Sequence, residues 1–145
     1  MTVANITQAR DEMCAVIQTA WDATDAVTAG LPMLYPDKAQ KTPSNGAYGR
    51  VTILHGGGGQ ATLSGETGAR RFRHTGIVTV QVFTPIGDGL VLSDQIVQIV
   101  HDALAGTTTS PGRVHLRNVR VNEVGETGAW HQTNVLADFE YDEVR

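Results

Sequence analysis

The sequence predicts an α+β fold: a four-stranded, mainly antiparallel sheet made of two hairpins, with two helices packed on one face, in the order α-β-β-α-β-β. Two amphipathic helical stretches alternate with two pairs of β-rich stretches, which predicts this order. Among the 145 residues, 17 are Thr and 16 are Val, and these β-branched residues favour strands. The length suits one domain, so we expect a single unit over residues 1–145.

The first helix is predicted over residues 6–22, with Asn5 or Thr7 as its N-cap. Its apolar residues recur at the spacing of one helical stripe: Ile6, Ala9, Met13, Val16, Ile17 and Ala20. Gly30 and three prolines then interrupt the periodicity. We therefore expect mostly irregular chain over residues 24–46, with room for a short strand at 33–35.

The first hairpin is predicted from strands at residues 47–54 and 72–84. The run TGIVTVQVF at 75–83 is the most strand-like in the chain, and Pro85 ends it. Four consecutive glycines, Gly56, Gly57, Gly58 and Gly59, follow the first strand, and such a run should not hold a regular element. We therefore expect a long hairpin tip that forms a flexible arm over residues 56–71.

The second half repeats the pattern of one helix and one hairpin. A helix is predicted from Leu90 or Ser93 to residue 105, with Ser93 as a possible cap. A hairpin follows, with strands at 114–124 and 130–141. In its last strand, apolar and mostly acidic residues alternate, which is typical of a strand with one buried face. The pentapeptide GETGA occurs at 65–69 and again at 125–129, each time between predicted strands, which supports two hairpins.

Charge and cysteine content narrow the function classes. The 11 Lys and Arg residues against 15 Asp and Glu residues leave a formal charge of -4, which argues against a generally basic nucleic-acid binder. The lone Cys14 cannot form an internal disulfide, so we expect folding in a reducing cytoplasm. No apolar run approaches the roughly 20 residues that a membrane-spanning helix needs, so no membrane partner is expected.

Motifs for catalysis, metals and cofactors are missing from the sequence. The glycine run can be aligned with a dinucleotide fingerprint, but no helix follows it to bind phosphate, so a hairpin tip is the better interpretation. The five histidines, at 55, 74, 101, 115 and 131, lack the close spacing of a zinc site. Ser64 lacks the flanking glycines of a nucleophile elbow. We expect no enzyme activity, no metal and no cofactor.

Two charged patches remain as candidate contact surfaces. The densest positive patch contains Arg70, Arg71, Arg73 and His74, which we expect on the projecting loop. Four carboxylates crowd into the last eight residues: Asp138, Glu140, Asp142 and Glu143. We expect the two patches at separated places on one protomer, and a head-to-tail contact between them can close copies into a ring. The alternative is that both patches are solvated surface; a nucleic-acid site is disfavoured because the positive patch is short and isolated.

Three stretches follow one another in a recognisable order: VTILHGG at 51–57, RRFRHTGIVTVQVFTP at 70–85, and Gly87-Asp88-Gly89 leading into a helix. This pattern resembles the tail terminator, or tail completion, proteins of long-tailed bacteriophages and related gene-transfer particles. The likeness runs from the first helix through Tyr35-Pro36 to the last strand and is strongest over residues 71–104. The resemblance implies no catalytic residue in this chain.

The resemblance implies a virion protein of the tail-neck junction, assembled in the host cytoplasm. Such subunits usually form a hexameric ring on the tail tube, stop its polymerisation and offer a surface to the head-side connector. The implied partners are other copies of the chain, the major tail tube protein and the connector or stopper protein. DNA would pass through the ring without specific binding. On this interpretation Arg70, Arg71, Arg73 and His74 contact a neighbouring subunit or the tube, and the arm orders on that contact.

Two alternatives stay open. Another head-tail joining component, such as a connector stopper, has a similar size and a similar lack of chemistry. A small ligand-binding or enzymatic domain that uses the four glycines at 56–59 is the rival from a different class.

Overall fold

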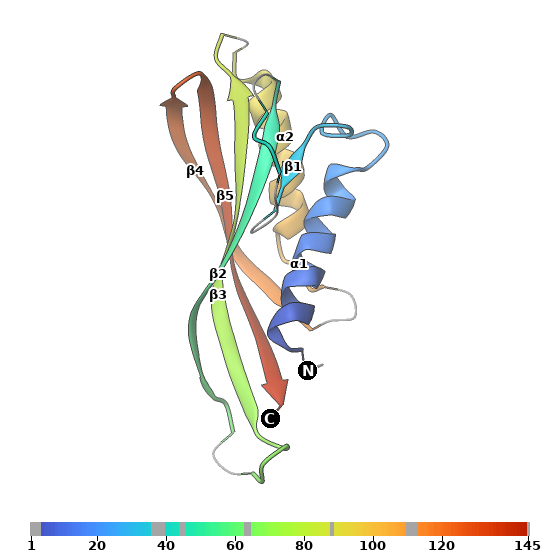
Figure 1. The fold of residues 1–145 in the computed structure, drawn as a ribbon, viewed down its shortest axis with the longest axis vertical. Helices are drawn as coiled ribbons and strands as arrows, with labels where there is room; N and C mark the ends of the chain where they lie inside the picture. The colour runs from blue at the N-terminus through green and yellow to red at the C-terminus, as the bar shows by residue number, and fades with distance from the viewer. Residues whose placement is uncertain are drawn as a thin grey trace.

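The chain folds as two helices and a five-stranded sheet (Figure 1). A computed structural model describes residues 4–35, 40–43, 46–62, 65–87, 89–109 and 113–144; Pro36, Ser64 and Asp88, which are named in the predictions above, lie outside these ranges. The elements, in chain order, are α1 (Ile6–Trp21), β1 (Met33–Leu34), β2 (Tyr48–Gln60), β3 (Arg71–Pro85), α2 (Val91–Leu104), β4 (His115–Thr127) and β5 (Trp130–Val144).

The sheet has the strand order β1-β2-β3-β5-β4. β2 pairs antiparallel with β3 and β4 pairs antiparallel with β5, which confirms both predicted hairpins, and β3 joins β5 antiparallel between them. The fifth strand, β1, runs parallel to β2, so the expected count of four strands is one too low. β1 has only two residues, too few to show a periodicity, and it is held where Gly49 N–H donates to Pro32 O (3.0 Å).

Both helices cover the same face of the sheet, as predicted, and the core lies between these two layers (Figure 1). The helices contribute Met13, Ile17, Trp21, Ile96, Val100 and Leu104. The sheet contributes alternate residues of its three central strands: Val51, Ile53, Val78, Val80, Val82, Val135, Ala137, Phe139 and Tyr141. The other face carries no helix. Neither described helix is long and apolar enough to cross a membrane.

The N-terminus of α1 follows a local sequence signal, and the N-terminus of α2 does not. Asn5 caps α1 in a capping box: Gln8 N–H donates to Asn5 Oδ1 (2.8 Å), and Asn5 N–H donates to Gln8 Oε1 (3.0 Å). The prediction of Ser93 as the cap of α2 is wrong. The helix begins at Val91 after Leu90, without a side-chain cap, because Ser93 is turned into the core with 1% of its surface exposed.

The expectation that four glycines end a strand is also wrong. β2 continues to Gln60, and Gly57, Gly58 and Gly59 pair with Thr75, His74 and Arg73 of β3. An irregularity between His55 and Gly57 marks the change of register. The continuous β3 supplies the hydrogen-bonding partner that the glycines cannot specify themselves. The hairpin therefore reaches past α1 as a ribbon in which β3 pairs with β2 on one side and, as far as Arg71, with β5 on the other, and its turn lies between Gln60 and Arg71 (Figure 1).

The two GETGA copies lie at the two hairpin turns, at opposite ends of the sheet (Figure 1). The β3–β5 register fixes this arrangement, because Arg71 pairs with Val144 at one end and Pro85 with Trp130 at the other. The ribbon end also holds both chain ends, where Ala4 N–H donates to Asp142 O (2.8 Å). The domain thus presents a different hairpin turn at each end.

Candidate assembly surface

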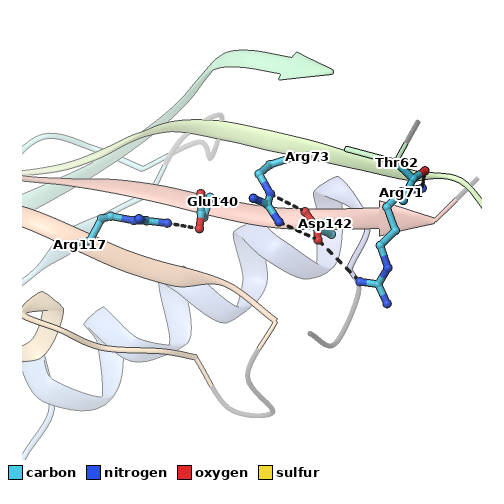
Figure 2. A network of polar contacts seen from close by, with 6 residues as sticks. All are labelled: Thr62, Arg71, Arg73, Arg117, Glu140 and Asp142. Atoms are coloured by element: carbon cyan, nitrogen blue, oxygen red, sulfur yellow. Dashed lines mark hydrogen bonds and ion pairs between the residues drawn. The ribbon is translucent and has the colours of Figure 1, made fainter. Parts of the chain in front are cut away.

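The open face of the sheet carries a row of paired charges beside the ribbon (Figure 2). Arg71 and Arg73 belong to β3, two residues apart, so their side chains share one face of the strand. That face is opposite to the one on which Val78, Val80 and Val82 are buried. Asp142 lies directly opposite Arg73 on β5. The β3–β5 register therefore brings the basic and acidic groups together on one molecule.

Asp142 is the centre of this row. Arg73 Nε donates to Asp142 Oδ1 (2.9 Å) and Arg73 Nη2 donates to Asp142 Oδ2 (3.3 Å), a two-pronged contact, while Arg71 Nη1 lies 3.6 Å from Oδ2. The Asp142 side chain is only 3% exposed. The hydrogen bonds from Arg73, and then the charges of Arg73 and Arg71, lower the pKa of Asp142, although burial alone would raise it. The carboxylate is thus held ionised by two arginines.

The row continues along β5 to β4. Arg117 pairs with Glu140, and Arg120 Nη1 lies 3.1 Å from Asp138 Oδ1. Asn118 Nδ2 donates to Asp138 Oδ2 (2.9 Å), and this hydrogen bond is the main reason why the pKa of Asp138 is lowered. Three carboxylates of β5 are therefore each matched by at least one arginine within the subunit.

Arg70 and His74 lie elsewhere. Arg70 belongs to the turn, where its Nε donates to Gly65 O (2.8 Å). His74 points to the opposite face, stacks on the Tyr141 ring at 5.0 Å between centroids, and places Nε2 3.4 Å from Glu143 Oε1. The four predicted contact residues therefore divide into a turn residue, an arginine pair on the open face and a histidine on the helix side.

The prediction that the positive and negative patches lie apart on the protomer is wrong. Arg71 and Arg73 are strand residues, not residues of a projecting loop, and they are paired with Asp142 of the same chain. Arg73 and Asp142 are 69 positions apart in sequence but lie directly opposite each other in the sheet. A head-to-tail contact therefore cannot rest on segregated charges here.

A second polar cluster lies on the helix side and was not predicted. His55 Nε2 lies 2.6 Å from Tyr141 Oη, and the His55 and His74 rings meet edge to face at 6.1 Å. Nothing in the sequence indicates that these two histidines are neighbours, because 18 residues lie between them. The β2–β3 pairing brings them together. Across the described part of the chain, no group of three or more His, Cys, Asp or Glu side chains could hold a metal ion.

The glycine run does not have the geometry of a phosphate-binding loop. Gly57, Gly58 and Gly59 are paired strand residues, and the chain continues into a turn and then β3. A phosphate loop of the dinucleotide type needs a helix N-terminus directly after the glycines. The interpretation as a ligand-binding loop therefore loses its main support.

Comparisons with known proteins agree with the fold and identify the family. A solved chain whose title gives no function matches with a TM-score of 0.65 and 22% identity, over 91% of this chain and 94% of the other. A chain from the structure titled "Virion of native gene transfer agent (GTA) particle" matches with a TM-score of 0.52 and 20% identity, over 92% and 96%. At these identities the matches establish a shared fold. No curated protein sequence matches the chain.

The family profile described as "Phage tail terminator protein" matches residues 13–137, which is most of the chain. This match covers α1 from Met13, the whole of β1, β2, β3, α2 and β4, and β5 as far as Ala137; the carboxylates of the charged row lie just beyond it. The resemblance noted from sequence is thereby confirmed. The chain belongs to the phage tail terminator family, whose members are structural components of the virion tail and not enzymes.

Proposed function

We propose that copies of this chain form a ring, of six subunits by analogy with the family, at the head-proximal end of the tail tube. The ring ends tube polymerisation and offers its other side to the head-tail connector. The observation that carries this proposal is the family match over residues 13–137. The two unlike ends of the subunit support it, because a terminator must meet the tube on one side and the connector on the other.

The ribbon formed by residues 55–60 and 71–76 is the proposed arm toward a neighbouring subunit or the tube. This ribbon extends past the helices, and among the described strands its β2 residues pair only with β3, so one edge is left for another protein (Figure 1). Packing against another protein would stabilise it. Arg70 is the proposed contact residue with most freedom, since its side chain bonds only to a carbonyl of its own turn among the contacts described.

Arg71, Arg73 and His74 are proposed to act indirectly, by keeping the base of the ribbon in register with β5. Their partners Asp142 and Glu143 lie at the end of that strand. Passage of DNA through the ring is consistent with the net charge of -4, because an acidic ring offers little general attraction to phosphate.

The direct test has two parts. The purified protein, mixed with the major tail tube protein, should form caps visible by electron microscopy on one end of each tube, and tube length should fall as its concentration rises. Particles produced without it should carry overlong tubes. Tubes of unchanged length in both experiments would contradict termination, and binding to isolated connectors but not to tubes would favour a connector stopper.

Charge reversal of Arg71 and Arg73 does not isolate assembly, because it would place two new carboxylates beside the buried Asp142 and disturb the fold. Arg70→Glu is the better variant: the side chain lies in a turn and its loss removes no ion pair among the described contacts. We expect unchanged thermal stability and weaker capping of tubes. Lys41→Glu provides the charge-matched control at an exposed position in the loop between β1 and β2.

A further inference from the structure

The edges of the sheet are protected to different degrees. β1 has its outer edge closed by a side chain: Tyr35 N–H donates to Gln40 Oε1 (2.9 Å), and Gln40 Nε2 donates to Met33 O (3.5 Å). β4 has an outer edge that is partly covered, where Leu116 N–H donates to Thr107 O (2.9 Å). Two irregularities and Asn118, with φ of 56°, also interrupt β4. These are the usual means of preventing unwanted strand pairing.

β2 has less protection: beyond its contact with β1 it carries one irregularity, between His55 and Gly57. That pairing stops at Arg50, and in the described part of the chain no strand lies along the outer edge of residues 51–60. This stretch contains no charged residue and no proline. Gly59 has open space where a Cβ would lie and needs no positive φ, so the monomer gives no reason for glycine there. Glycine within a strand often marks a close approach by another backbone.

A groove of about 410 Å³ runs beside this free edge, between β2 and α1. Ile53 forms its strand side, and α1 contributes Cys14 and Ala15 among others. The Tyr35 hydroxyl, bonded to Gln18, closes the end nearest β1. A strand added to the edge would project every second side chain into this groove. Main-chain pairing with a pocket for alternate side chains is the usual geometry of strand addition.

We propose that the free edge of β2 receives strand β4 of a neighbouring copy of this chain. The proposal rests on the ring proposed above and names its subunit contact. β2 and β4 are unlike edges of one sheet and run antiparallel to each other, as the order of antiparallel pairings requires. Joining unlike edges in succession lets subunits close into a ring, whereas joining like edges gives a twofold dimer.

β4 offers one regular stretch for this contact, residues 120–123 between its two irregularities. Val121 lies opposite the buried Val135, so its side chain faces the helix side of the sheet, yet it is 46% exposed. The groove beside β2 lies on the same side. Val121 is therefore an apolar side chain in position to enter the groove of the next subunit, and the short regular stretch limits pairing to one place.

The native Cys14 in the groove makes a direct test possible. Val121→Cys should cross-link to Cys14 of the next subunit under mild oxidation or with a short bismaleimide, giving a ladder of covalent species larger than dimers on a denaturing gel. Val91→Cys, at a 70% exposed valine on α2, is the matched control and should give no ladder. The double variant Cys14→Ser/Val121→Cys should give none either; dimers from it would indicate a β4–β4 contact and overturn the proposal.

A second measurement does not depend on cross-linking geometry. Ala15→Arg fills the groove from an exposed position on α1, and we expect the concentration needed for ring formation, measured by light scattering, to rise about tenfold or more. Thr19→Arg makes the same charge change on the same helix outside the groove and should leave assembly unchanged. Circular dichroism should show both variants folded.

The outcomes separate the two proposals. Rings that form normally with Ala15→Arg and give no ladder with Val121→Cys would overturn the edge contact and leave the ring intact. If the wild-type protein stays monomeric at high concentration, and the Val121→Cys variant gives no ladder even when mixed with tail tubes, the edge contact is overturned and the result counts against the ring as well.

Discussion

His55 on β2 contacts Tyr141 on β5 across the intervening strand, with Nε2 2.6 Å from Oη. The contact is possible because Gly76, opposite both His55 and Phe139, has no side chain. The Phe139 ring packs into the space so created, 5.2 Å from the His55 ring. Three strands are thereby tied together where the ribbon leaves the core.

Gly76→Ala should therefore be among the most destabilising single changes in the protein. An added Cβ would overlap Leu54 O and lie 2.6 Å from Phe139 Cζ, so backbone and ring would both have to move. We expect a loss of about 3 kcal/mol or more in the free energy of unfolding, measured with urea. Gly59→Ala is the control, because a Cβ there meets nothing within 4 Å, and it should be neutral or slightly stabilising. Equal effects of the two variants would contradict this account of Gly76.

Tyr141→Phe should cost about 1 kcal/mol of stability by leaving His55 Nε2 without its partner. Burial, followed by the charge of Glu143, raises the pKa of Tyr141 to about 12, so the hydroxyl keeps its proton and can donate it to neutral His55. The ring itself stays, so packing changes little. Thermal unfolding near pH 8 measures the loss; an unchanged midpoint would show that the hydrogen bond contributes nothing.

Stability should fall as the pH is lowered from about 7 to 5, in part through His55. Burial, followed by the charges of Arg10 and His74, lowers the pKa of His55. As the pH falls, His55 of the unfolded chain binds a proton near pH 6.5, whereas His55 of the folded protein binds it only at lower pH. The contribution of neutral His55 to the free energy of unfolding is therefore complete above about pH 6.5 and declines below it. His55→Gln should flatten the pH dependence of the unfolding free energy in this window. A profile as steep as that of the wild type would assign the effect to other groups.

Arg73→Ala should destabilise the ribbon end, since the buried Asp142 would keep only the longer contact to Arg71. The loss should be modest because the Arg73 side chain is 44% exposed. Arg70→Ala is the matched control and should change stability little. Hydrogen exchange should locate the effect in residues 71–74 and 141–143; faster exchange throughout the sheet would contradict a local role.

The lowered pKa of Asp142 predicts a second loss of stability, at acidic pH. Its contribution to stability is complete above about pH 4, where the carboxyl of the unfolded chain is ionised, and is lost as the pH falls through the lower value of the folded state. Asp142→Asn should therefore remove part of the acid dependence of unfolding below pH 4. Its stability at neutral pH should be lower than that of the wild type.

Local patterns predicted most of the elements, and the failures share one cause. The stripe of α1 and the alternation in β5 are properties of short windows, and both elements form near the expected residues. The short strand expected at 33–35 forms as β1 over Met33–Leu34, but the extension of β2 through the glycines has no such signal, and neither has the pairing of β1 with β2. They exist because β2 lies beside Pro32–Leu34 and because β3 pairs with the glycine backbone, and those neighbours come from other parts of the chain.

The candidate surface illustrates the same limit. The spacing of Arg71 and Arg73 correctly places them on one face, and the spacing of Glu140 and Asp142 does the same for the acidic groups. Nothing in either stretch shows that β3 and β5 are neighbours, so the charges were expected to lie apart. The family resemblance could identify the kind of protein but not this pairing.

β3 keeps an unbroken pairing with β5 from the turn of the ribbon into the middle of the core, and β2 runs beside it with one irregularity between His55 and Gly57. A force applied at the turn is transmitted along two continuous strands to the contact between His55 and Tyr141 and so to the layer beneath α1. The ribbon is thus firmly connected to the core, so a protein bound at its turn would also fix the orientation of the whole subunit.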